Sequence, residues 1–155
     1  MTQIFLTHSP QTLQNYYGAR ALMQLRACGT VRLNHSRQPL SVDEFVDAAR
    51  GCQIIVASHD AAAPAALFEC LPQLLAYCRV SVDIRNIDVE AASAHGVLVT
   101  RVTPGFDSSV SEWVVAVMID LSRGTSRAAA SYWQAKAPDI VMGRELRGST
   151  LGIVG

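Results

Sequence analysis

The residues best suited to chemistry in this chain follow a short apolar stretch. Ser58, His59 and Asp60 place a hydroxyl, an imidazole and a carboxylate directly after the apolar residues 52–57. A continuous apolar run of this length is typical of a strand buried on both faces of a parallel sheet. Ligands of open α/β sheets bind at the carboxyl ends of such strands. We therefore expect Ser58 and His59 to contact a small ligand, and a capping or solvent-facing role for His59 fits the same position.

The cysteines and histidines form no pattern that indicates a metal site. The four cysteines match no CxxC or zinc-finger spacing, and each has apolar or small neighbours, which predicts buried, reduced thiols. The four histidines are dispersed and include no HExxH motif. We therefore expect no bound metal. The residues concerned are Cys28, Cys52, Cys70 and Cys78, together with His8, His35, His59 and His95.

Short apolar segments alternate with segments of helical periodicity over the first hundred residues. This alternation predicts a parallel sheet flanked by helices. Ser41 with Glu44 forms a capping-box pattern at the start of one helix. The expected strands are 4–6, 31–33, 52–57, 80–84 and 97–102, and the expected helices are 10–28, 42–50, 61–70 and 88–95.

The last third of the chain has a different pattern. A second capping box, Ser109 with Glu112, precedes a wide apolar face and predicts a helix running to Arg123, followed by another over 126–135. Residues 143–150 are polar and rich in glycine, as in a connector between lobes. Residues 151–155 then predict the start of a buried strand with no crossover helix after it, so we expect a truncated unit.

Composition and charge exclude several classes of protein. The chain has 155 residues, a formal net charge of +0 and 17% charged residues, which fits a neutral domain without a field that would gather nucleic acid. No apolar run reaches the length of a membrane span, and the first residues lack the basic region of a signal peptide. We expect a cytoplasmic protein with no membrane or nucleic-acid partner.

The residues that follow the first predicted strand argue against two other functions of α/β proteins. A phospho-receiver needs clustered carboxylates at strand ends to hold magnesium, but the first strand is followed by Thr7, His8 and Ser9. A flavin phosphate site needs a glycine-containing run that opens the first helix, and residues 9–12 contain no glycine.

From Val80 onward, the order of motifs resembles that of the D-isomer-specific 2-hydroxyacid dehydrogenases, the family that includes phosphoglycerate dehydrogenase. Asn86-Ile87-Asp88 and Gly96-Val97-Leu98-Val99-Thr100 are similar to its NID and G[IV]xVT motifs. Thr103-Pro104-Gly105 and Ser109-Val110-Ser111-Glu112 are similar to its TPG and SVAE motifs. The segment 143–155 is similar to GxELxGKTLGIVG, so that Gly155 corresponds to the first glycine of the dinucleotide fingerprint.

The resemblance implies a domain organisation. Residues 1–103 correspond to a flavodoxin-like, parallel-sheet substrate-binding lobe, and residues 104–144 to inter-lobe helices and a linker. Residues 145–155 correspond to the truncated start of a Rossmann domain that binds NAD, with NADP as the open alternative.

The resemblance also implies site residues. In the family, backbone amides of the segment aligned with 80–84 hold the substrate carboxylate, so Ser81, Val82 and Asp83 join Ser58 and His59 as substrate-binding candidates. Val110 and Gly155 are the cofactor-binding candidates. The family's catalytic Arg, Glu and His lie beyond this chain, which therefore supplies no catalytic residue.

Three residues depart from the family's GxGxDNID pattern. Ser81 and Asp83 replace glycines and Arg85 replaces an aspartate, so side chains here restrict the approach of a substrate to the backbone. Arg85 could attract an anion, but an arginine between Asp83 and Asp88 is more typical of a surface charge cluster.

These features predict the N-terminal part of an NAD-dependent oxidoreductase that interconverts D-2-hydroxy acids and 2-oxo acids. We expect the 155 residues alone to be inactive and the whole enzyme to be a homodimer, as the resemblance implies. The alternative is a non-catalytic dimerisation or regulatory module derived from such an enzyme.

Overall fold

The computed structural model describes residues 1–154 and divides them into two compact units. Unit 1 spans Met1–Thr103 and unit 2 begins at Pro104. The substrate-binding role expected for residues 1–103 stays a prediction. The two units are described separately below.

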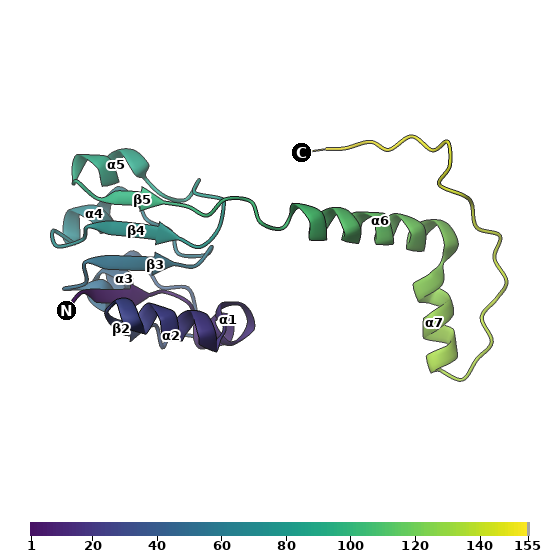
Figure 1. Cartoon of the computed structure of the whole chain (residues 1–155), viewed down its shortest axis with the longest axis horizontal. Helices are drawn as coiled ribbons and strands as arrows, with labels where there is room; N and C mark the ends of the chain where they lie inside the picture. The colour runs from purple at the N-terminus through teal and green to yellow at the C-terminus, as the bar shows by residue number, and fades with distance from the viewer. Residues whose placement is uncertain (155) are drawn as a thin grey trace. The chain divides into compact units, whose positions relative to one another are not determined.

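Unit 1 is built on a five-stranded, fully parallel sheet with the order β2-β1-β3-β4-β5 (Figure 1). This is the flavodoxin-like strand order, in which the direction of winding reverses between β1 and β3. The predicted fold class of unit 1 is therefore confirmed. The strands are β1 (Gln3–Leu6), β2 (Thr30–Leu33), β3 (Ile54–Ala57), β4 (Ala76–Arg79) and β5 (Leu98–Thr100).

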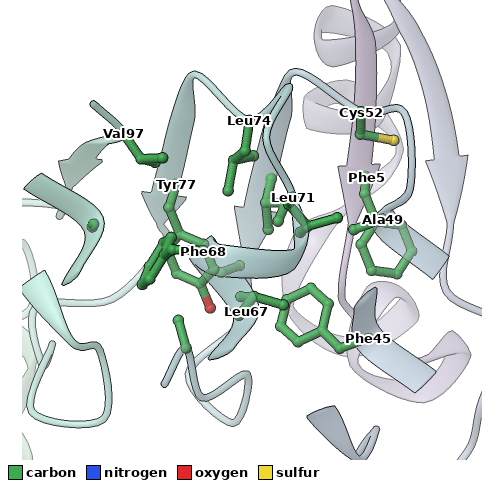
Figure 2. Close-up of a cluster of buried hydrophobic side chains, with 14 of the residues drawn as sticks. Phe5, Phe45, Ala49, Cys52, Leu67, Phe68, Leu71, Leu74, Tyr77 and Val97 are labelled. Atoms are coloured by element: carbon green, nitrogen blue, oxygen red, sulfur yellow. The ribbon is translucent and has the colours of Figure 1, made fainter. Parts of the chain in front are cut away.

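Helices cover both faces of this sheet. Phe5 packs with side chains from α3 (Val42–Ala49), α4 (Ala65–Cys70) and α5 (Val89–Ala94), and Figure 2 shows part of this cluster. Ile4 and Leu6, which flank Phe5, pack with residues of the opposite helical layer. Successive strand side chains point to opposite faces, so β1 contributes to both cores. The second layer consists of α1 (Pro10–Thr12), η1 (Leu13–Tyr17) and α2 (Ala19–Cys28).

The expected continuous helix over 10–28 is wrong. A π-helical turn, η1, follows α1, and the helix breaks at Gly18, where φ is 79° and ψ is 152°. Only glycine adopts this region without strain. Periodicity of the apolar residues continues across the break, so the pattern alone did not reveal it.

The expected strand over 80–84 is also misplaced, because β4 ends at Arg79. In β4 the side chains of Tyr77 and Arg79 are buried and those of Ala76 and Cys78 are half-buried. A buried arginine interrupts the apolar pattern, which shifted the prediction toward the apolar residues that follow. Residues 80–84 form a loop instead.

The thiols differ from their expected burial. Cys52 is buried and Cys78 is half-buried, whereas Cys28 and Cys70 are exposed at the ends of α2 and α4. Apolar neighbours in sequence do not fix which side of a helix end a side chain occupies.

The capping box at the start of α3 is confirmed. The Ser41 side chain accepts a hydrogen bond from the Glu44 amide at 3.3 Å, and the Glu44 carboxylate accepts one from the Ser41 amide at 2.8 Å. The Glu44 carboxylate also accepts a hydrogen bond from the Ser41 hydroxyl, and the bonds from the Ser41 amide and hydroxyl hold the pKa of Glu44 below its usual value. The cap fixes the first turn of a helix that carries Phe45 into the core.

Replacing Ser41 with alanine is expected to lower the free energy of unfolding of unit 1 by about 1 kcal/mol, because α3 loses its cap. Urea unfolding followed by circular dichroism measures the change. Ser93→Ala is the control, since its hydroxyl donates to the Val89 carbonyl within α5 and caps no helix. An equal loss in both variants would contradict the special role of the cap.

Unit 2 contains two helices in its described part, α6 (Asp107–Arg123) and α7 (Thr125–Trp133). Both match the predicted helices within a few residues. The predicted cap of α6 is wrong, because the Ser109 hydroxyl lies inside the helix and donates to the Phe106 carbonyl at 3.0 Å. The helix begins three residues earlier than its capping-box pattern indicates, because its N-cap is Phe106.

The predicted strand over 151–155 is not formed in the described residues. Residues 151–154 have no regular secondary structure, and their side chains are exposed. A strand requires hydrogen bonds to a neighbouring strand, and the described part of unit 2 offers none. Gly155 lies outside the described residues. Among residues 1–154, no helix is long and apolar enough to cross a membrane.

Candidate substrate site

Three loops meet at the carboxyl edge of the unit 1 sheet. They follow β1, β3 and β4, and parallel strands bring these ends to one edge. The Thr7 hydroxyl accepts a hydrogen bond from the Ser58 amide at 2.8 Å and donates to the Ser58 hydroxyl at 3.2 Å. The predicted site residues Ser58 and His59 therefore stand beside the end of β1, with Ser58 half-buried and His59 exposed.

Arg79, the last residue of β4, holds the loop after β3 through hydrogen bonds to its backbone. This guanidinium donates to the carbonyl oxygens of Ser58, of His59 at 2.7 Å and of Ala61 at 2.9 Å. It also donates to the side-chain oxygen of Asn86. The Arg79 side chain is only 1% exposed. The sequence analysis did not predict this role for Arg79, because strands buried in a sheet were expected to be apolar. The one available signal was an arginine within an otherwise apolar segment.

The second predicted group, Ser81 to Asp83, lies in the loop directly after β4. All three residues are half-buried. Their backbone amides have no hydrogen-bond acceptor among the described residues, whereas the neighbouring Val80 amide donates to the Ala57 carbonyl at 3.0 Å. None of the three has a φ in the left-handed region. The serine and the aspartate that replace glycines are thus accommodated without backbone strain.

Two of the departures from the family pattern compensate each other. The Arg85 guanidinium donates to the Asp83 carboxylate at 2.8 Å and, through Nε, at 3.0 Å. The Arg85 side chain is 91% exposed, which agrees with the surface charge cluster favoured from the sequence. The hydrogen bonds from Arg85 hold the pKa of Asp83 well below its usual range.

Replacing Arg85 with glutamine is therefore expected to raise the pKa of Asp83 toward its ordinary value of about 3.9. In the unsubstituted chain, the pKa of Asp83 in the folded state lies below its value in the unfolded state. The ion pair therefore stabilises the fold at pH values above the unfolded-state pKa, and this stabilisation is lost as the pH falls through the folded-state pKa. A carbon-13 NMR titration of the Asp83 carboxyl measures the shift. An unchanged titration would show that the two side chains do not pair in solution.

A cavity of about 300 Å³ opens at the ends of β1, β2 and β3. Its wall carries one cationic side chain, Arg37, and one anionic side chain, Asp60. Ser58 contributes to the same wall, whereas His59 and the Ser81–Asp83 group do not. Of the predicted substrate-binding residues, Ser58 alone therefore lines this cavity. The remaining wall residues are Thr7, Ser9, Gln11, Thr12, Asn34, Gln38, Pro39, Leu40, Phe45, Ala61 and Ala62.

Of the two cofactor-binding candidates, Val110 lies in the described part of the chain. Val110 lies on α6 and is 55% exposed. Gly155 lies outside the described residues.

Residues 5–150 match the family "D-isomer specific 2-hydroxyacid dehydrogenase, catalytic domain". This match covers most of an α/β chain, and the chain therefore belongs to this family of oxidoreductases. The family resemblance read from the sequence motifs is confirmed.

Individual relatives support the same assignment. The D-3-phosphoglycerate dehydrogenase of Rattus norvegicus is 30% identical over 123 residues, which cover 77% of this chain and 22% of that protein. The (S)-sulfolactate dehydrogenase of Chromohalobacter salexigens is 39% identical over 88 residues, or 54% of this chain and 28% of that protein. The chain thus spans roughly a fifth to a quarter of these relatives' lengths.

A solved structure shows the same fold. The pyruvate reductase of Chlamydomonas reinhardtii has a TM-score of 0.75 at 21% identity, with 95% of this chain and 43% of that chain covered.

Proposed function

We propose that unit 1 is the substrate-binding lobe of an NAD- or NADP-dependent enzyme that interconverts D-2-hydroxy acids and 2-oxo acids. The observation that carries the proposal is the row of backbone amides at Ser81, Val82 and Asp83, at the carboxyl edge of the sheet, which have no acceptor among residues 1–154. Amides with no internal partner are suited to hold a carboxylate. Membership of the dehydrogenase family supplies the reaction class.

Reduction of a 2-oxo acid requires groups that this chain provides only in part. The reaction needs a hydride donor, a proton donor near the forming alkoxide and donors for the substrate carboxylate. Unit 1 offers the last of these. The residues present do not fit a dinucleotide by themselves, because no glycine-rich turn leading into a helix N-terminus follows a strand in the described part of unit 2. The chain alone is therefore proposed to bind substrate without turning it over.

Titration with oxalate, an unreactive analogue of a 2-oxo acid, tests this proposal by nitrogen-15 NMR. The amides of Ser81, Val82 and Asp83 are expected to shift together along one saturable curve, whereas acetate at the same ionic strength leaves them unmoved. Shifts spread over surface lysine and arginine residues, with these amides unaffected, would overturn the proposal. Measurable oxidation of NADH with glyoxylate, hydroxypyruvate or 2-oxoglutarate by the isolated chain would overturn the expected inactivity.

We further propose that the complete enzyme is a homodimer in which α6 is covered by a second copy. Its exposed apolar side chains include Trp113 at 67% exposure and Leu121 at 81%. Such a surface favours association over solvent exposure. Light scattering of the complete enzyme at micromolar concentration is expected to give the mass of two subunits. A monomeric mass would overturn the proposal.

A further inference from the structure

Arg79 is a buried cation without an anionic partner. Its side chain is the largest of those that are fully buried in the described chain. No carboxylate among residues 1–154 lies within ion-pair distance of its guanidinium. Burying a charge is costly unless hydrogen bonds compensate it, and a guanidinium does not escape the cost by losing its proton. The hydrogen bonds that Arg79 makes therefore indicate the role of its buried guanidinium.

Most of those bonds go to the carbonyl groups of a single loop. Arg79 binds the carbonyl oxygens of Ser58, His59 and Ala61, and its guanidinium carbon lies 5.9 Å from the centre of the Tyr77 ring. The Tyr77 hydroxyl donates to the same Ala61 carbonyl at 2.8 Å. Three carbonyls of one short loop are thus turned inward toward one cation.

The geometry of the peptide bond determines where the amides of the same loop point. In a trans peptide the carbonyl and the following amide point in opposite directions. Because the carbonyls of residues 58, 59 and 61 face Arg79, the amides of His59, Asp60 and Ala62 face away from it. None of these three amides has an acceptor among the described residues. Asp60 and Ala62 belong to the wall of the cavity described above.

We propose that Arg79 is a positioning residue for an anionic substrate: it holds the loop after β3 so that the amides of His59, Asp60 and Ala62 face outward as donors. This inference rests on the proposed function, to which it adds a second group of amide donors beside Ser81, Val82 and Asp83. Arg79 itself does not touch the substrate.

Asn86 ties the two loops together. Its side-chain oxygen accepts a hydrogen bond from Arg79, and its side-chain nitrogen donates to the His59 carbonyl at 3.2 Å. Its own carbonyl accepts the Ala63 amide at 2.9 Å. The loop after β3 is therefore fixed against the loop after β4, and both groups of amides are held at one edge of the sheet.

The test compares variants of the full 155-residue chain by oxalate titration and by nitrogen-15 relaxation. Arg79→Met removes the charge and every donor, and its oxalate affinity is expected to fall about ten-fold. Order parameters of the amides at 59, 60 and 62 are expected to fall as well, because the inward carbonyls lose their partner. Asn86→Ala, which removes only the second tie, is expected to weaken oxalate about three-fold.

Two controls separate positioning from general stability. Leu71→Ala removes a core side chain that is 4% exposed and contacts neither loop through a hydrogen bond. It is expected to lower the melting temperature without changing oxalate affinity or loop order. Arg32→Met removes another arginine that donates to two carbonyls, those of Ala48 and Arg50, on a different part of the sheet. It is expected to leave both readouts unchanged.

Wild-type affinity in Arg79→Met, or an equal loss of loop order in Leu71→Ala, would overturn the proposal. If Arg79→Met does not fold, Arg79→Lys replaces it: lysine keeps the charge but not the fork of donors, so wild-type affinity and loop order in both Arg79→Lys and Asn86→Ala would overturn the proposal. Failure of the wild-type chain to bind oxalate would overturn the proposed function. In that case the order of amides 59, 60 and 62 alone decides whether Arg79 positions the loop.

Discussion

Replacing Phe5 with alanine is expected to lower the free energy of unfolding of unit 1 by about 3–5 kcal/mol, the largest stability change that we predict for this chain. Phe5 is fully buried on β1, the strand that joins β2 to β3 at the reversal of the sheet. Its ring lies 5.8 Å from that of Phe45 on α3. Truncation would leave a cavity beneath α3 that the rigid sheet cannot close.

Urea unfolding followed by circular dichroism measures this loss. Leu75→Ala is the matched control in the same unit, because Leu75 is 63% exposed and its removal leaves no cavity. It is expected to change stability by no more than about 0.5 kcal/mol. Similar losses in the two variants would contradict the placement of Phe5 in the core.

The ion pair between Asp83 and Arg85, in the loop after β4, leads to the second large effect. Replacing Asp83 with glycine is expected to tighten oxalate binding about five-fold at low salt, because the change removes a carboxylate beside the amide donors and leaves the Arg85 cation unpaired. Arg85→Gln is expected to weaken oxalate by a similar factor, since it leaves the Asp83 anion unpaired. The two variants start from one ion pair and move affinity in opposite directions.

Oxalate titrations at two salt concentrations distinguish charge from shape. Screening by salt is expected to reduce both effects. Asp83→Asn is the control, because it removes the charge while keeping the size of the side chain, and its affinity should match that of Asp83→Gly. A gain in Asp83→Gly that Asp83→Asn does not share would instead indicate that the side chain blocks the approach to the backbone.

The sequence alone was sufficient for the class of fold and for the family. Alternating apolar and helical segments predicted the parallel sheet, and the box of Ser41 and Glu44 located the start of α3. These features depend on short stretches of chain, so local patterns contain them. The order of motifs from Val80 onward identified the family, which the match over residues 5–150 confirms.

Only the tertiary structure revealed how the site is held. The break at Gly18 and the end of β4 at Arg79 escaped the sequence patterns, as did the role of Arg79 beneath the loop after β3. Arg79 binds carbonyl groups some 20 residues away in the chain, and its partners are backbone atoms, which every residue type carries. The order of side chains in the sequence therefore cannot predict such a contact. The sequence determined that a parallel sheet forms, while the packing of β4 against β3 decided where the fourth strand ends and that a buried cation stands at its end.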